Sequence, residues 1–176
     1  VYPLGWGWEK TAGFLEKHAH RELTADDLAA KIADTVCELY AGTPGDDVSI
    51  VVIKVRRKLV ANIFTGPPFN SSKDEKAVER FLRYAGQHVV CGGTTAKIVS
   101  HYMGMPLEVD LDTMTEDVPP IARIQGIDLV SEGILTLTRT SMLLRSKVDK
   151  KKIQFQNDGV SNLLRIMLTV DHVHFI

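Results

Sequence analysis

Apolar residues in the first part of the chain follow a helical pattern and then a strand pattern. They recur every three or four positions over 28–39, which is the spacing of a helix with one apolar face. Thr24 and Asp27 form a capping-box-like pair just before this helix, in which the hydroxyl accepts from a free backbone N–H. We also expect a short helix at 9–18, and the β-branched run at 48–55 predicts a strand.

Beyond this run, strand-like and helix-like segments alternate. We expect strands at 59–65, 88–91, 107–111, 127–130 and 172–176, and helices at 72–84, 94–102, 135–144 and 160–168. Ser72 is the expected cap of the first of these helices. Alternation of this kind implies parallel strands joined by crossovers. The predicted fold class is therefore α/β, with a boundary near Arg57 and a layered module with a mostly parallel sheet at 58–176.

Composition and charge narrow the class of protein. Apolar residues make up 44% of the 176 residues, and the formal net charge is −1, which disfavours a surface built chiefly to bind nucleic acid or an anionic membrane. Cys37 and Cys91 are too few for a disulfide framework. No apolar run approaches the roughly 20 residues of a membrane span, and no signal peptide is recognised. We expect a cytoplasmic, bacterial-type protein without nucleic-acid or membrane partners, with formation of a homo-oligomer left open.

The adjacent acids Asp46 and Asp47 follow a tight Gly- and Pro-containing turn at the mouth of the predicted strand 48–55. Neighbouring side chains of a strand point to opposite faces, so one of the two would face any given site. Hard cations such as Mg²⁺ and Mn²⁺ require several oxygen ligands. By spacing alone, the pair fits a turn whose acids face solvent.

In its wider context the pair resembles a known motif. The stretch 24–55 is similar to the C-terminal end of a PPM-type metal-dependent protein phosphatase domain of the bacterial sporulation stage II protein E branch. That branch ends its catalytic domain with a long helix, a Gly/Pro turn, an Asp-Asp-x-Thr/Ser motif, here Asp46 to Ser49, and a β-branched strand. Further segments that look like a subgroup of this branch and its C-terminal extension lie at 4–8, 66–68, 90–96 and 126–133.

The resemblance implies an activity for a parent protein. Phosphatases of this type use two Mn²⁺ or Mg²⁺ ions to activate a water that attacks phosphoserine or phosphothreonine, here on a regulatory protein such as an anti-sigma-factor antagonist. Asp46 matches the metal-binding aspartate, and Asp47 takes a supporting position beside it. Residues 1–57 would be the tail of the phosphatase α/β sandwich, and 58–176 an extension with a regulatory role. The other family aspartates have no match, and both chain ends look cut, so we expect this fragment to be inactive alone.

The segment Gly92-Gly93-Thr94-Thr95 is a second candidate site. A strand that runs into two glycines and then a helix exposes backbone N–H groups at the positive end of the helix dipole, which suits a phosphate or carboxylate. The lysine of a P-loop and the spaced glycines of a dinucleotide fingerprint are absent. The alternative is a glycine turn needed for close packing, with Thr94 as the helix cap. Cys91 as a nucleophile is disfavoured because no general base can be assigned to it.

Two further groups complete the candidates. Asp128 and Glu132 lie around a predicted strand followed by a helix, and they could line the same crevice as Gly92 and hold a small anion or a nucleotide; alternatively, Glu132 simply starts the helix. His172 and His174 alternate on one strand face. Two imidazoles at this spacing can share a metal ion, whereas a half-exposed strand explains the same pattern without a ligand.

Overall fold

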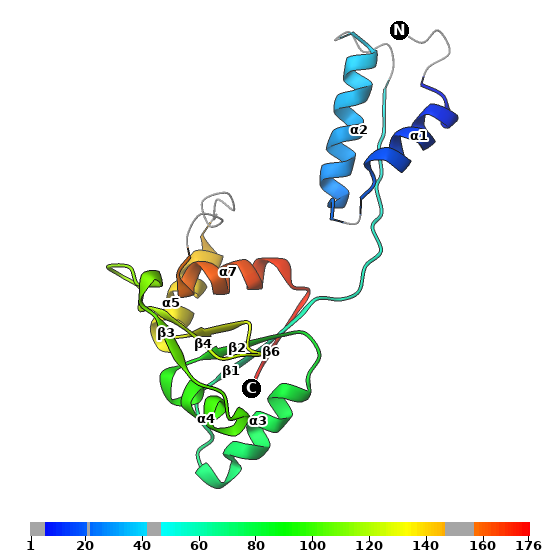
Figure 1. Ribbon diagram of the computed structural model, residues 1–176. Coiled ribbons are helices and arrows are strands. Elements are labelled where there is room, and N and C mark those ends of the chain that lie inside the picture. The colour runs from blue at the N-terminus through cyan, green and yellow to red at the C-terminus, as the bar shows by residue number, and fades with distance from the viewer. Residues whose placement is uncertain (1–5, 21, 42–46, 147–156) are drawn as a thin grey trace. The chain divides into compact units, whose positions relative to one another are not determined.

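The computed structural model describes residues 6–20, 22–41, 47–146 and 157–176. The chain forms two compact units, 1–57 and 58–176 (Figure 1). The division falls at the boundary that the sequence places near Arg57, while the assignment of either unit to a phosphatase stays a prediction. No helix in the described part of the chain has the length and apolar character needed to cross a membrane.

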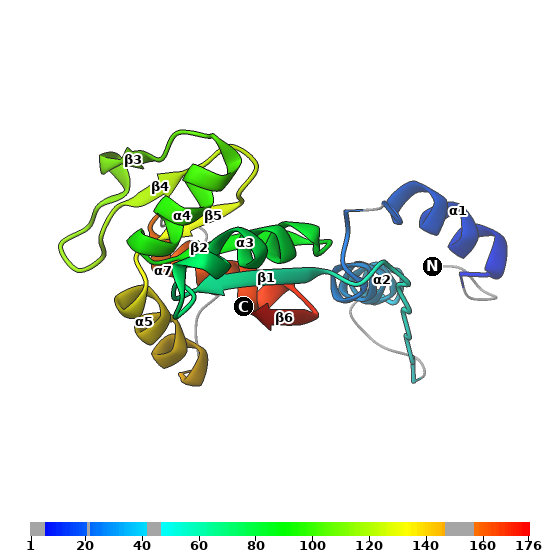
Figure 2. The ribbon, with the colours of Figure 1, turned by 90° about the horizontal axis from the view of Figure 1, so that it is seen from below.

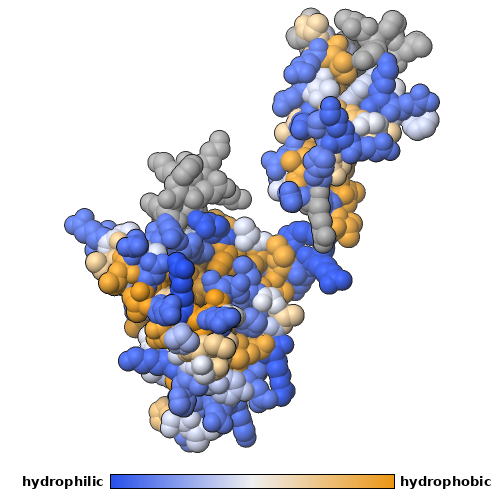
Figure 3. Space-filling model, viewed as in Figure 1, coloured by the Kyte–Doolittle hydropathy of each residue, from blue (hydrophilic) through white to orange (hydrophobic). Residues whose placement is uncertain are grey.

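Two helices make up the regular structure described for the first unit, α1 (Trp8–His18) and α2 (Ala25–Leu39). The predicted capping box at the start of α2 is confirmed. The Thr24 hydroxyl accepts from the backbone N–H of Asp27 at 3.0 Å, and the Asp27 carboxylate accepts from the backbone N–H of Thr24 at 3.4 Å. Among the apolar side chains described for this unit only Ile32 is buried, and Figure 3 shows apolar surface in orange scattered over it.

The predicted strand at 48–55 is wrong. The segment forms no ladder with any described strand. Val51, Ile53 and Val55 are 83%, 83% and 92% exposed. A β-branched sequence favours an extended backbone, but a strand exists only where a neighbour pairs with it and covers one face. Asp46, just before this segment, lies outside the described residues.

The second unit is built on a six-stranded sheet of order β3-β4-β5-β2-β1-β6. Its strands are β1 (Val60–Thr65), β2 (Gln87–Cys91), β3 (Glu108–Asp110), β4 (Ile121–Arg123), β5 (Leu129–Ser131) and β6 (His172–Phe175). The neighbours β5, β2, β1 and β6 are parallel, whereas β4 is antiparallel to both β3 and β5. The predicted layered α/β module with a mostly parallel sheet is therefore confirmed. The three-residue strand β4 was not predicted from the sequence.

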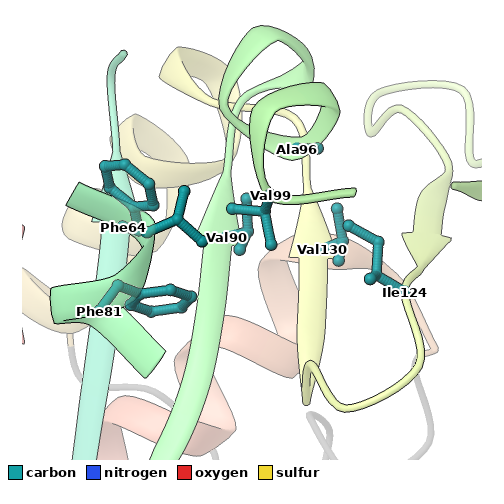
Figure 4. Packing of buried hydrophobic residues seen from close by; sticks show 8 residues of the cluster. Phe64, Phe81, Val90, Ala96, Val99, Ile124 and Val130 are labelled. Carbon is teal, nitrogen blue, oxygen red and sulfur yellow. The ribbon is translucent and has the colours of Figure 1, made fainter. Parts of the chain in front are cut away.

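Helices cover both faces of this sheet (Figures 1 and 2). They are α3 (Asp74–Arg83), α4 (Gly93–Met103), α5 (Ile134–Arg145) and α7 (Gly159–Thr169), with short 3-10 turns at Ser71–Lys73 and Leu111–Thr113. Figure 4 shows the core layer beneath α3 and α4, in which Phe64 and Phe81 lie with ring centroids 5.4 Å apart. A second apolar cluster on the opposite face includes Ile63 and Leu163. Ile63 and Phe64 serve different layers because successive strand residues point to opposite faces.

The start of α3 differs from the sequence prediction. The helix begins at Asp74, and Ser72 belongs to the preceding 3-10 turn. The side chain of Asn70, two residues earlier, accepts from the backbone N–H of Ser72 at 3.0 Å. Asn and Ser both satisfy free backbone donors at such positions, and the loop path after β1 decides that Asn70 is the residue used.

Candidate functional site

The C-terminal ends of three parallel strands meet at one edge of the sheet. β1, β2 and β5 are consecutive neighbours there, and each is followed by a turn and a helix, α3, α4 and α5 respectively. Parallel α/β sheets bind their ligands in front of this edge, because the loops and helix N-termini converge there. The predicted segments at Gly92 and Glu132 both follow strands at this edge.

The turns after β2 and β5 are in close contact. The backbone N–H of Gly92 donates to the carbonyl oxygen of Ser131 at 2.8 Å. A Cβ added at Gly133 would lie 3.3 Å from the Cα of Gly92, and Gly92 itself has a φ of +114°, which side-chain-bearing residues rarely adopt. The conformation of Gly92 therefore requires a glycine, and Gly133 leaves little room for a side chain, whereas Gly93, the second glycine of the packing alternative, has open space around its Cα.

The N-terminus of α4 nevertheless has no side-chain cap. Gly92 occupies the capping position, and the predicted cap by Thr94 is wrong. In the first backbone hydrogen bond of the helix, the N–H of Ala96 donates to the carbonyl oxygen of Gly92 at 2.9 Å. The N–H groups of Gly93 and Thr94 therefore have no acceptor within the helix. Gly93 and Thr94 are exposed. These donors therefore face solvent at the positive end of the helix dipole.

Thr95 is the buried member of the same turn. Its residue is 1% exposed, and its hydroxyl oxygen would lie 3.5 Å from a Cβ added at Gly92. An acceptor placed over the Gly92 turn would lie within reach of both this hydroxyl and the backbone donors.

Glu132 belongs to the neighbouring helix. Its carboxylate accepts from the backbone N–H of Leu135 at 2.9 Å and of Thr136 at 3.4 Å, so it caps α5, as the alternative for this residue predicted. The carboxylate of Glu132 therefore already occupies backbone donors at the N-terminus of α5. Of the two adjacent helix N-termini, that of α4 is thus the one left open to an external anion, and Glu132 itself offers an acceptor rather than an anion ligand.

Asp128 does not line this crevice, and that prediction is wrong. It precedes β5, at the opposite end of the strand from Glu132. Its carboxylate accepts from the backbone N–H of His88 at 2.7 Å, and its own N–H donates to the His88 carbonyl at 2.9 Å. Asp128 therefore ties the starts of β2 and β5 together.

A cavity of about 510 Å³ opens beside Thr94, between α3 and α4. Lys97 lines it and brings a positive charge one turn from Thr94. Asp74 contributes a buried carboxylate oxygen that no described residue hydrogen-bonds, and Tyr102 contributes an aromatic ring. Sequence analysis missed Asp74 and Lys97, because only the pairing of β1 with β2 brings α3 beside α4.

Cys91 lies beneath the crevice as a core residue. It is buried, and the Ser131 hydroxyl lies 3.5 Å from its sulfur. Burial raises the pKa of the Cys91 thiol, an effect that the hydrogen bond from Ser131 partly offsets. The protonated thiol is a poor nucleophile, so burial, like the lack of an assignable base in the sequence, disfavours Cys91 as a nucleophile.

The predicted metal ligands belong to the first unit. Asp46 is outside the described residues, and Asp47 lines a hollow of about 280 Å³ together with Val36, Cys37 and Tyr40 of the α2 region. Within the described ranges no three His, Cys, Asp or Glu side chains gather in a group that could hold a metal ion. A Mn²⁺ or Mg²⁺ site at Asp46 and Asp47 therefore stays a prediction.

Comparison with known proteins adds no relative. No protein-family model matches the chain, and neither curated proteins nor solved structures give a match. The phosphatase resemblance consequently depends on the sequence segments described above, and the functional argument depends on the geometry of the second unit.

Proposed function

We propose that residues 58–176 form a non-catalytic regulatory module that binds a small anionic ligand, carrying a phosphate or carboxylate group, at the N-terminus of α4. The observation that carries the proposal is the uncapped first turn of α4 beside the buried hydroxyl of Thr95. The ligand's anionic group accepts from the backbone N–H groups of Gly93 and Thr94 and from the Thr95 hydroxyl.

The cavity next to this turn supports a ligand larger than a bare anion. Its volume of about 510 Å³ lies within the range of small-molecule sites, roughly 300–1,000 Å³. Lys97 supplies a positive charge near Thr94 for the anionic group, while Asp74 and Glu75 supply two carboxylates for a hydroxyl or amino group elsewhere on the ligand, the unpaired oxygen of Asp74 among them.

Titration of the full chain with inorganic phosphate tests the anion site. We expect amide chemical-shift changes in NMR spectra that are concentrated at residues 92–95. Thr95→Val removes the hydroxyl at nearly constant volume and should weaken phosphate binding about tenfold, since a hydrogen bond to a charged group contributes about 1.5 kcal/mol or more. Thr94→Glu should abolish binding, because its carboxylate competes for the same donors.

Thr138→Val on the exposed side of α5 is the matched control and should bind phosphate like the unaltered chain. Shifts spread evenly over the surface, or equal affinity of the Thr95→Val and Thr138→Val variants, would contradict the proposal.

The sequence resemblance supports a second proposal for the parent protein. The Asp46-Asp47-x-Ser49 motif and its surroundings favour a cytoplasmic Mn²⁺- or Mg²⁺-dependent phosphatase that acts on phosphoserine or phosphothreonine of a regulatory protein. Because the other family aspartates have no match in this chain, we expect it to show no Mn²⁺-dependent hydrolysis of a phosphoryl ester. Hydrolysis by the chain that Asp46→Ala abolishes would instead show that a complete centre exists within these residues.

A further inference from the structure

The edge strand β6 carries two imidazoles on one face. His172 lies opposite Val60 of β1, and His174 lies opposite Asn62. The ring centroids of the two histidines are 4.4 Å apart, with an angle of 74° between the rings. β6 is the last strand of the sheet, with β1 as its single neighbour (Figure 2). His172 is exposed and His174 is half-buried, so solutes reach the pair from the open edge.

Asn62 determines which nitrogen of His174 carries its hydrogen. This residue is fully buried in β1, and its amide nitrogen donates to the carbonyl oxygens of Ala85 at 3.3 Å and Gln87 at 3.4 Å. The amide oxygen therefore points away from these carbonyls and lies 3.0 Å from Nδ1 of His174. An amide oxygen only accepts, so Nδ1 of His174 is the donor and its Nε2 keeps a free lone pair.

This arrangement is the one that metal-binding histidines use. A ligating imidazole almost always donates its second ring N–H to an oxygen, which fixes the tautomer and the orientation of the ring. A buried asparagine in a central strand is unusual, because its polar groups must all be satisfied. Here Asn62 is satisfied by the carbonyl groups of Ala85 and Gln87 on one side and by His174 on the other.

His172 is the exposed member of the pair. The positive charge of Lys58, partial desolvation and the neighbouring His174 lower the pKa of His172, in that order of importance. Lys58 also repels a bound cation, so its presence weakens the affinity of such a site without removing either ligand.

The separation of the two rings is compatible with one shared ion. With metal–nitrogen bonds of about 2.0–2.1 Å and an angle of 90–110° at the metal, two imidazole centroids lie roughly 4.5–5 Å apart, close to the observed 4.4 Å. Imidazole ligands suit Zn²⁺, Cu²⁺ and Ni²⁺. No third protein ligand joins the pair within the described part of the chain, so water fills the remaining positions. We propose that His172 and His174 together bind one divalent transition-metal ion through their Nε2 atoms.

Calorimetric titration of the full, chelator-treated chain with ZnCl₂ tests the site. We expect saturable binding of one ion, weakened at least tenfold in both His172→Ala and His174→Ala. Lys58→Ala should tighten binding several-fold, because it removes the nearby positive charge. His20→Ala, an exposed histidine of the first unit, is the matched control and should bind like the unaltered chain.

Imidazole ¹H–¹⁵N spectra of the metal-free chain give a second measurement that depends on no variant. They should show the Nδ1–H tautomer for His174, and Zn²⁺ should shift the Nε2 resonances of both residues. An Nε2–H tautomer at His174, the absence of saturable binding, or unchanged binding in the two alanine variants would overturn the proposal.

Discussion

The two units of this protein contain similar local signals but differ in what they bury. In the first unit a capping box starts α2 and a β-branched run follows it, yet Ile32 is the single buried apolar side chain among its described residues. In the second unit, strands of comparable sequence pair and enclose two apolar clusters. Full burial of a large apolar side chain contributes about 1.5–3 kcal/mol. The difference teaches that pairing across the chain, rather than local propensity, produces a core.

The largest effect is expected from Phe81→Ala. Phe81 is fully buried between Phe64 and the ring of His88, so its loss should lower the free energy of unfolding of the second unit by about 3–5 kcal/mol. Denaturant unfolding followed by circular dichroism measures this change. Val55→Ala, at a side chain 92% exposed in the first unit, should stay within about 0.5 kcal/mol. Equal losses of unfolding free energy in the two variants would contradict the difference in burial between the units.

The two cysteines report the same contrast through their reactivity. Cys37 is exposed on α2, whereas Cys91 is buried and burial raises its thiol pKa. At neutral pH we expect iodoacetamide to modify Cys91 at least about a hundredfold more slowly than Cys37. Mass spectrometry of timed samples gives both rates. Denaturant should bring the rates together, and a fast reaction at Cys91 in the folded chain would disprove its place in the core.

Glycine substitution should have opposite signs in the two units. Gly86 has a φ of +122°, and a Cβ there would clash with the carbonyl oxygen of Val60, so Gly86→Ala should destabilise the second unit by about 2 kcal/mol or more. Gly13 lies inside α1 with open space around it. Gly13→Ala should therefore stabilise α1 by up to about 1 kcal/mol. Thermal unfolding of both variants tests the pair.

The smallest effect is expected at the cap of α2. Thr24→Ala removes the hydroxyl that accepts from Asp27 and should cost about 1 kcal/mol of local helix stability. Amide hydrogen exchange at the start of α2 should become faster, while exchange in β1 and β2 stays unchanged. Slower exchange in α2, or faster exchange in the sheet, would contradict the expectation that the cap stabilises α2 alone.

The sequence identified the elements whose signals are local. The capping box of α2, the glycine turn before α4 and the apolar runs of β1 and β2 each depend on neighbouring residues, and each is present in the structure. The β-branched run at 48–55 has the same local signal as β1. It lacks a paired neighbour among the described strands, and that absence cannot be recognised from propensity.

The candidate anion site was only partly predictable. The glycines and threonines at 92–95 mark a strand-to-helix turn in any α/β sequence. Three other features depend on how side chains orient after folding. They are the open N-terminus of α4, the capping of α5 by Glu132 and the placement of Asp128 at the far end of β5. Hydrogen bonds between residues forty positions apart leave no periodic trace in a sequence.

By itself, the sequence determined the α/β class, the order of most elements and the glycine turn before α4, because hydrophobic periodicity and backbone sterics act over a few residues. The tertiary structure alone decided three further features. It placed α3 beside α4 to form the cavity at Thr94, it brought Asn62 to His174 across 112 positions, and it paired none of the described strands with 48–55. Each depends on which strands become neighbours, and that choice is made by the burial and hydrogen bonding of the whole sheet.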